Sequence, residues 1–149
     1  MKRGILGAGI CSLLLTNAVW AACPRGAETL FFCNTQKANK QIELCDAGKT
    51  VNYSFGKKGQ KPELAIAVPR SAASTFQWQG IGRWMSYSVN VPNANYVYNV
   101  FWGVDRLEEK HPIEAGVNVE KNGELLTTIY CKEKGLINNL EGVDLKPAE

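Results

Sequence analysis

The stretch RWMSYSVNVPNANYVYNVFW, from Arg83 to Trp102, decides the fold class of this chain. Apolar and polar residues alternate along both halves, and the Pro and Asn residues of the PNAN segment between them accept turn dihedrals. A tip at Asn93-Ala94 predicts these facing pairs: Val91 with Tyr96, Val89 with Tyr98, Tyr87 with Val100, and Met85 with Trp102. The other face carries Ser86, Ser88, Asn90 and Asn99. One apolar and one polar face are typical of an antiparallel sheet that covers a core.

The N-terminus is predicted to be a signal peptide, residues 1–21. A basic start at Lys2-Arg3 is followed by an apolar run from Ile5 to Leu15, which is too short to span a bilayer. Small residues follow, and we expect cleavage after Ala21 or Ala22. The mature protein is therefore expected to be periplasmic or secreted, in an oxidising compartment where cysteines pair.

A lipid-anchored form is the alternative, because Cys23 would then be the first mature residue and would carry the lipid. The usual signal for lipidation has an aliphatic residue three places before that cysteine. The bulky Trp20 holds this place, and we therefore favour cleavage without lipidation.

The mature chain is close to neutral, since the loss of Lys2 and Arg3 leaves 15 basic and 14 acidic side chains, a net charge of +1. No field of one sign is available to recruit nucleic acid or an anionic membrane, and no further apolar segment could span a bilayer. About 128 residues suit one domain. We place it at 22–132, followed by a C-terminal tail at 133–149 that we expect to be unstructured or loosely packed.

Short alternating runs predict four strands before the central hairpin: Leu30 to Thr35, Gln41 to Cys45, Thr50 to Phe55, and Glu63 to Val68. Two segments lack a clean period. Pro69 to Gly82 is rich in small and polar residues, and Gly103 to Pro112 is highly charged. Both are long enough to be functional loops.

The last predicted hairpin joins Ile113–Glu120 to Glu124–Lys132. It turns either through two residues, Asn122-Gly123, or through a three-residue loop with Gly123 in the left-handed region. We prefer the second alternative, because it brings Cys131 to the apolar face. It predicts these pairs: Val119 with Leu125, Val117 with Thr127, Ala115 with Ile129, and Ile113 with Cys131.

Eight strands in sequential hairpins, without a convincing helix, predict an all-β fold. A small antiparallel eight-stranded barrel or closed meander is expected, because closure removes the exposed sheet edges.

Four cysteines remain in the mature chain, and an even count in an exported domain predicts two disulfides. With a two-residue tip at Ala38-Asn39, Cys33 points inward and Cys45 outward. If the first and last strands meet, Cys33 can bond to Cys131, and Cys23 then pairs with Cys45. A three-residue turn in the first hairpin would instead reopen a bond between Cys33 and Cys45.

The residues offer little chemistry for catalysis. His111 is the single histidine, whereas metal sites usually need several converging ligands, and no nucleophile motif accompanies it. Gly80-Ile81-Gly82 is too short for a phosphate loop. We therefore expect no enzyme activity, no metal and no cofactor.

Several short segments together resemble the bacterial periplasmic and membrane-bound lysozyme inhibitors. They are LFFC, VNY, ELAIAV, RSAAS, an aromatic hairpin and IYC, spread from Leu30 to Cys131. The resemblance implies a small antiparallel barrel whose first and last strands are tied by a disulfide, with a serine-bearing loop that enters the lysozyme cleft. In this chain no glycine follows Ser71 or Ser74, where the family has a Ser-Gly motif.

The expected function is therefore an exported protein that inhibits a lysozyme-type cell-wall hydrolase by inserting the loops 69–82 and 103–112. The resemblance implies that Ser71 or Ser74 bonds to the catalytic carboxylates, and that Arg83 or Arg106 adds charged contacts. The same loops place Trp78 and His111 among the expected contact residues.

Two alternative functions remain. One is an immunity protein against a rival's periplasmic toxin, and the other is a carrier of a small apolar ligand inside the barrel. The carrier requires that the aromatic residues Tyr87, Tyr96, Tyr98 and Trp102 line a cavity, whereas we expect them to fill the interior.

Overall fold

The computed structural model describes residues 23–149, and within this range the chain is all-β without a helix. The predicted signal peptide lies outside the described residues. The strands are β1 (Glu28–Asn34), β2 (Lys40–Asp46), β3 (Thr50–Lys57), β4 (Leu64–Pro69), β5 (Ser74–Gln77), β6 (Trp84–Asn93), β7 (Tyr96–Asp105), β8 (Ile113–Lys121), β9 (Glu124–Tyr130), β10 (Ile137–Asn138) and β11 (Lys146–Pro147).

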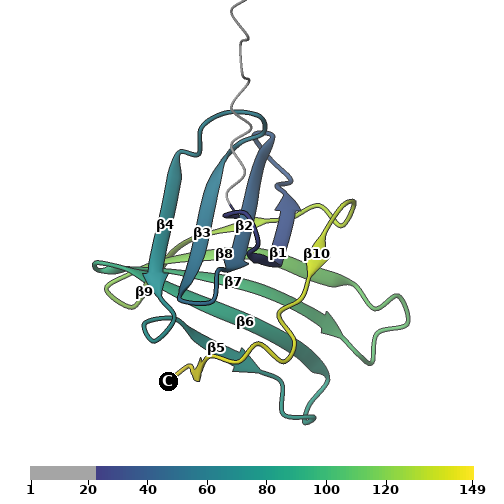
Figure 1. Cartoon of the computed structure of the whole chain (residues 1–149). Coiled ribbons are helices and arrows are strands. Elements are labelled where there is room, and N and C mark those ends of the chain that lie inside the picture. Colours follow the sequence, from purple (N-terminus) through teal and green to yellow (C-terminus); the bar gives the residue numbers. More distant parts are fainter. Residues whose placement is uncertain (1–22) are drawn as a thin grey trace, which may run out of the picture.

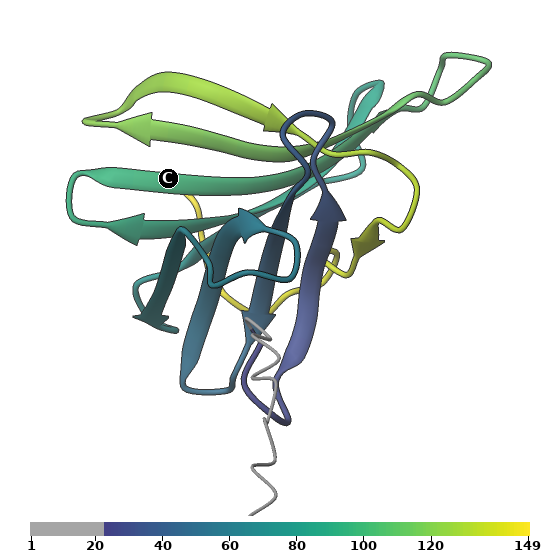
Figure 2. The same ribbon diagram turned by 90° about the horizontal axis from the view of Figure 1, so that it is seen from above.

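These strands form two sheets. The small sheet has the order β10-β1-β2-β3-β4, and the large sheet has the order β11-β5-β6-β7-β8-β9. Figure 1 shows the small sheet crossing the large one at a steep angle, and Figure 2 shows the two layers from above. All pairings are antiparallel except that of β11 with β5, which is parallel.

The predicted closed barrel of eight strands is therefore wrong. The described chain has eleven strands, and β4 and β5 belong to different sheets although only a short corner separates them. Because the two sheets cross steeply, a strand that turns this corner cannot continue the ladder of the sheet it leaves. An orthogonal packing of two sheets is the result.

The central hairpin forms as predicted, but its register differs by two residues. Asn93 pairs with Tyr96, Val91 with Tyr98 and Val89 with Val100, so the turn lies at Ala94-Asn95. Ala94 adopts a left-handed φ of 53°. A shift of two residues keeps every side chain on its predicted face, because side chains alternate with a period of two.

The last hairpin uses the alternative that we did not prefer. Lys121 pairs with Glu124, and Asn122 and Gly123 both have positive φ, 51° and 80°, as in a type I′ turn. A register shift after Val119 then adds one residue to β9. The turn alone would point Cys131 away from the core, and the bulge returns it to the apolar face.

The core lies between the sheets and consists mainly of aliphatic side chains. Fully buried members are Ile42, Leu44, Val51, Val89, Val100 and Val117. The ring of Tyr53 stacks on Tyr98 with centroids 5.0 Å apart, and Tyr87 stacks on Trp102 at 6.1 Å. These aromatic side chains pack against one another between the sheets, which supports filling of the interior over a ligand cavity. Burial raises the pKa of Tyr53.

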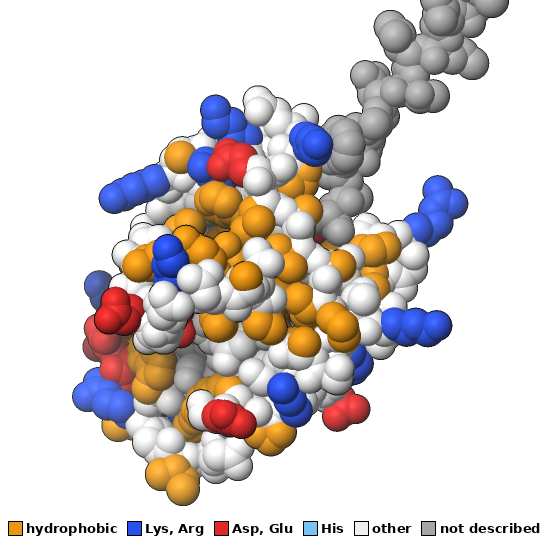
Figure 3. Space-filling model, turned by 90° about the vertical axis from the view of Figure 1, so that its left-hand side faces the viewer, with side chains coloured by type: hydrophobic (Ala, Val, Ile, Leu, Met, Phe, Trp, Pro, Cys, Tyr) orange, Lys and Arg blue, Asp and Glu red, His pale blue; other side chains and the backbone are white. Residues whose placement is uncertain are grey.

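The core is less well covered on the side where β4 ends the small sheet. Leu64 and Ile66 of β4 and Phe55 of β3 are only partly buried against it. Figure 3 views the molecule from this side and shows hydrophobic side chains gathered in the middle, with charged ones mostly toward the rim.

Both predicted disulfides are present. Cys33 bonds to Cys131 with their Cα atoms 5.7 Å apart, and Cys23 bonds to Cys45 at 5.5 Å. Cys33 and Cys131 belong to the core, where a bridge between Thr35 and Cys131 joins the end of β1 to the end of β9. Cys45 is buried outside that core, where it fixes the N-terminal segment.

The C-terminal segment is not an unstructured tail. β10 pairs with β1, β11 pairs with β5, and Leu140 between them is fully buried. Arg70 forms an ion pair with Asp46 and also donates a hydrogen bond of 2.7 Å to the carbonyl of Asp144. Because it contacts both sheets, this segment belongs to the folded body.

Candidate functional site

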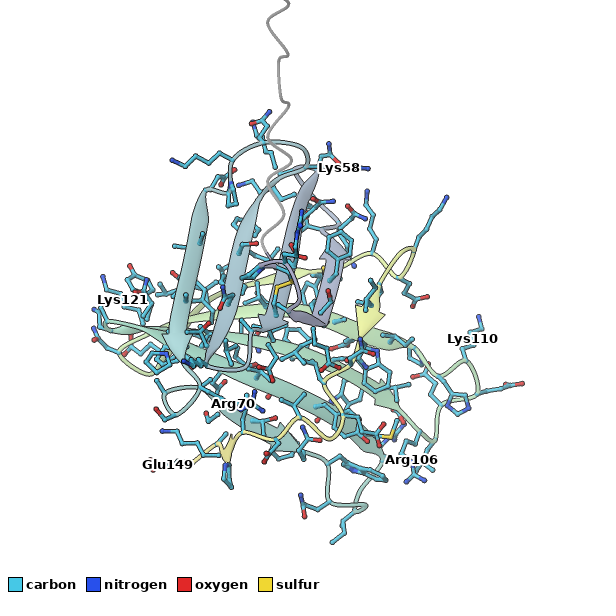
Figure 4. The ribbon with its side chains drawn as sticks, viewed as in Figure 1. Lys58, Arg70, Arg106, Lys110, Lys121 and Glu149 are labelled. Carbon is cyan, nitrogen blue, oxygen red and sulfur yellow. A yellow bond between two sulfur atoms is a disulfide. The ribbon has the colours of Figure 1, made fainter. Side chains whose placement is uncertain are left out.

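Two loops meet at one end of the large sheet, where β5 leads into β6 and β7 leads into β8. We call this surface the loop end; it comprises residues 78–83 and 106–112. The guanidinium of Arg106 lies 4.7 Å from the centre of the Trp78 ring, which joins the two loops by a cation–π contact. Trp78 in turn donates its indole N–H to the carbonyl of Ile81 at 2.9 Å. Arg106 is labelled at this end of the molecule in Figure 4.

A second contact between the loops is the ion pair of Arg83 with Asp105. Nε of Arg83 lies 2.9 Å and its Nη2 lies 2.6 Å from Oδ2 of Asp105, so the guanidinium binds the carboxylate through two nitrogens. The hydrogen bond to Arg83 lowers the pKa of Asp105, and the same bond raises the pKa of Arg83. Because the backbone N–H of Arg106 also donates to the carbonyl of Arg83 at 2.8 Å, the ladder of β6 and β7 continues into both loops.

His111 ends the second loop with a left-handed φ of 44°. Its Nδ1 lies 3.2 Å from the carbonyl oxygen of Asp105, so this nitrogen carries the proton in that contact. The exposed imidazole thus closes the loop on itself, and in the described part of the chain no carboxylate or hydroxyl is hydrogen-bonded to its ring.

The loop end presents large apolar side chains to solvent. Ile81 is 83% exposed and Leu107 is 73% exposed, one from each loop. Trp84 is 38% exposed, and its ring lies over Gly103, where any side chain would collide with it. Exposed apolar side chains beside a stacked arginine are typical of surfaces that contact another protein.

Ser71 and Ser74 are not part of the loop end. The expected loop 69–82 contains β5, which separates both serines from Trp78. Ser71 is exposed at the corner between the sheets, beside Arg70, and Figure 4 shows Arg70 well away from Arg106. Ser74 lies within β5, where its Oγ accepts a hydrogen bond of 3.3 Å from Asn90.

Strand β5 was not predicted, because STFQ is only four residues long. The residues that arrange the site were not predicted either. Asp105, Ile81 and Leu107 were inside the proposed loops but were not selected. Arg83 directly precedes β6 and Asp105 is the last residue of β7, so opposite charges stand at the open end of the hairpin. This pattern is the signal that could have indicated an ion pair there.

The described residues offer no obvious metal centre. The one grouping of potential ligands found among residues 23–149 is Cys23, Glu43 and Cys45, and the two sulfur atoms in it are bonded to each other. No helix in this range could span a membrane.

No family model, curated protein or solved structure that we compared with this chain matches it.

Proposed function

We propose that this protein is an exported binding protein that inhibits a lysozyme-type cell-wall hydrolase through its loop end. The observation that carries the proposal is the convergence of two loops with exposed apolar side chains on a disulfide-bonded β scaffold. The resemblance of the sequence to lysozyme inhibitors supports the choice of target. An immunity protein that blocks a periplasmic toxin would use the same surface.

Arg106 is the best-placed residue to bind the acidic catalytic groups of such an enzyme. Its planar guanidinium is already held by Trp78, so little conformational entropy is lost when its N–H groups meet a carboxylate. Arg83 is less suited, because two of its nitrogens, Nε and Nη2, already bind Asp105. Ser71 and Ser74 have no role in the proposed inhibition, since both lie away from the loop end.

Ile81 and Leu107 supply the apolar contacts. Each is largely exposed in the free protein, so burial against a partner removes apolar surface from water. The ion pair of Arg83 and Asp105 links the two loops where they join β6 and β7.

The test is a turbidity assay in which mature protein is titrated against lysozymes of the animal and phage classes. We expect stoichiometric inhibition of at least one class. Arg106→Ala should weaken it roughly tenfold or more, as expected for an interface arginine. Lys58→Ala is the matched control, because Lys58 is an exposed cation next to β3 of the small sheet, far from the loop end in Figure 4. No inhibition of any class would reject the proposal, and inhibition that ignores Arg106→Ala would reject the loop end as its site.

A further inference from the structure

The outer face of the large sheet carries a row of aromatic residues that the proposed function does not use. The residues of this aromatic row pair in series across β5 to β9 and are Phe76, Ser88, Phe101, Gly116 and Tyr130. Figure 1 shows no segment of the described chain packed beneath this face. The row is therefore open to a ligand.

The aromatic side chains of the row are unusually accessible. Phe76 is 47% exposed and Tyr130 is 44% exposed, while the ring of Phe101 meets Tyr130 edge to face with centroids 6.3 Å apart. The positions between them are small. Gly116 has no room for a side chain, because a Cβ there would collide with the carbonyl oxygen of Ile129. Aromatic and small residues thus alternate from strand to strand.

A second row of polar side chains runs beside the first. We call it the amide row; it comprises Ser74, Asn90, Asn99, Asn118 and Thr128, which also pair in series across β5 to β9. Asn90 donates to Ser74 Oγ at 3.3 Å, and Asn99 donates to Asn90 Oδ1 at 2.7 Å. Asn118 donates to Asn99 Oδ1 at 3.2 Å, and Thr128 donates to Asn118 Oδ1 at 2.7 Å.

These hydrogen bonds fix the orientation of the amide groups but leave some of their N–H donors unused. An asparagine amide has two N–H donors, and the bonds along the row use one of them on each amide. All three asparagines are partly accessible. The row therefore offers oriented amide groups that can bond to hydroxyl or acetamido groups.

Charge selects the kind of ligand that fits this face. None of the ten residues in the two rows is ionisable except for the phenol of Tyr130, although the whole sequence carries 31 basic and acidic side chains. The residues that flank the rows on β8 are Glu114 and Glu120, which repel anions. These carboxylates disfavour a nucleic acid or another polyanion, and a neutral polymer rich in hydroxyl groups matches the uncharged face better.

The interval between the aromatic positions on β5 and β7 agrees with one such polymer. The rings of Phe101 and Tyr130 form one edge-to-face pair, with centroids 6.3 Å apart, and so act as one aromatic platform. Phe76 on β5 lies two strands from Phe101 on β7, an interval of roughly 10 Å across the sheet. This interval is comparable to the disaccharide repeat of an extended β-1,4-linked glycan. We propose that the outer face of the large sheet binds a neutral β-1,4-linked glycan across its strands, with aromatic rings against sugar faces and the amide row against their polar substituents.

The test is calorimetric titration of the mature protein with chitohexaose and with cellohexaose. We expect binding of at least one, and a Phe76→Leu, Tyr130→Leu double variant should bind it roughly fivefold to 150-fold more weakly, from the usual value of an aromatic contact at each ring. Leucine keeps the apolar character but lacks the flat ring. Phe76→Tyr should retain binding, because it keeps the ring.

Ile137→Ala is the matched control, because Ile137 is 43% exposed but lies in the small sheet. Absence of binding to both oligosaccharides at millimolar concentration would overturn the proposal. It would also be overturned by unchanged affinity in the double variant, or by a dimer in sedimentation that the double variant abolishes, since the face would then be a contact between copies. The proposal is independent of the inhibitor function, because Arg106→Ala should leave glycan binding intact.

Discussion

Removal of the disulfide between Cys33 and Cys131 should destabilise the protein more than removal of the one between Cys23 and Cys45. The two bonds span sequence separations of 98 and 22 residues. The loop-entropy relation gives losses of about 4.7 and about 3.4 kcal/mol for these separations. Replacement of Cys33 and Cys131 by Ala also removes sulfur from the core, which adds to the first loss.

Urea unfolding of the two double alanine variants, followed by tryptophan fluorescence, measures the difference. We expect the variant without Cys33 and Cys131 to unfold at clearly lower urea, because a loss near 5 kcal/mol is a large part of the roughly 5–15 kcal/mol that stabilises a domain. Equal or reversed losses would refute the reasoning, since they would mean that the longer bond does not restrict the unfolded chain more. Unfolding of the wild-type protein in reductant serves as the control.

Four other substitutions test the structure. Gly123→Ala should lower the free energy of unfolding by about 1 kcal/mol, and Ala94→Gly should raise it by roughly 0.5–1 kcal/mol, because both positions have positive φ. Urea midpoints of the two variants that move in the same direction would contradict this. Leu140→Ala should cost about 2–5 kcal/mol because its side chain is fully buried, and a loss below about 1 kcal/mol would mean that the C-terminal segment is not part of the core. Arg83→Ala should return the pKa of Asp105 toward its ordinary 3.8, and the stability that the pair contributes should be complete above that value and disappear as the pH falls through the lowered pKa. Carboxyl NMR titration of both proteins measures this shift, and an identical Asp105 pKa in the two would exclude the pair as its cause.

The sequence allowed the faces of the strands to be predicted more securely than their pairing. Alternation decides which side chains point inward, and an error of two residues in a turn does not change it. The hairpin of β6 and β7 shows this, because Val91 lies opposite Tyr98 rather than Tyr96 and yet keeps its predicted face. In the last hairpin, Cys131 lies on the predicted face although the turn differs from the predicted one. The two-residue turn and the bulge each reverse the direction in which its side chain points, so the two changes cancel.

The elements that were missed depend on contacts that are distant in sequence. β10 and β11 are two residues long and have no period of their own, and each forms because a strand from another part of the chain offers its edge. The closure of the fold could not be predicted either. Whether consecutive hairpins form one barrel or two crossed sheets depends on the corner between β4 and β5, where the sequence has only small and polar residues.

At the candidate site, the sequence identified the participants but not their grouping. Trp78, Arg83, Arg106 and His111 all lie at the loop end, whereas both serines lie apart from it. The reason is that the loops were delimited by their lack of periodicity, which does not reveal a short strand inside one of them. The serines were chosen from a resemblance rather than from a contact, so nothing in the alternation of the chain tested their position.

The loop end is also an extension of the hairpin that fixes the fold. Trp84 pairs with Asp105 as the last step of the β6 and β7 ladder, and the Arg83 side chain continues that ladder as an ion pair. The loops therefore begin from a rigid base, while their exposed residues Ile81 and Leu107 are outside the core. It follows that substitutions at these two positions can alter the choice of partner at little cost in stability, whereas a change at Asp105 alters the position of both loops at once.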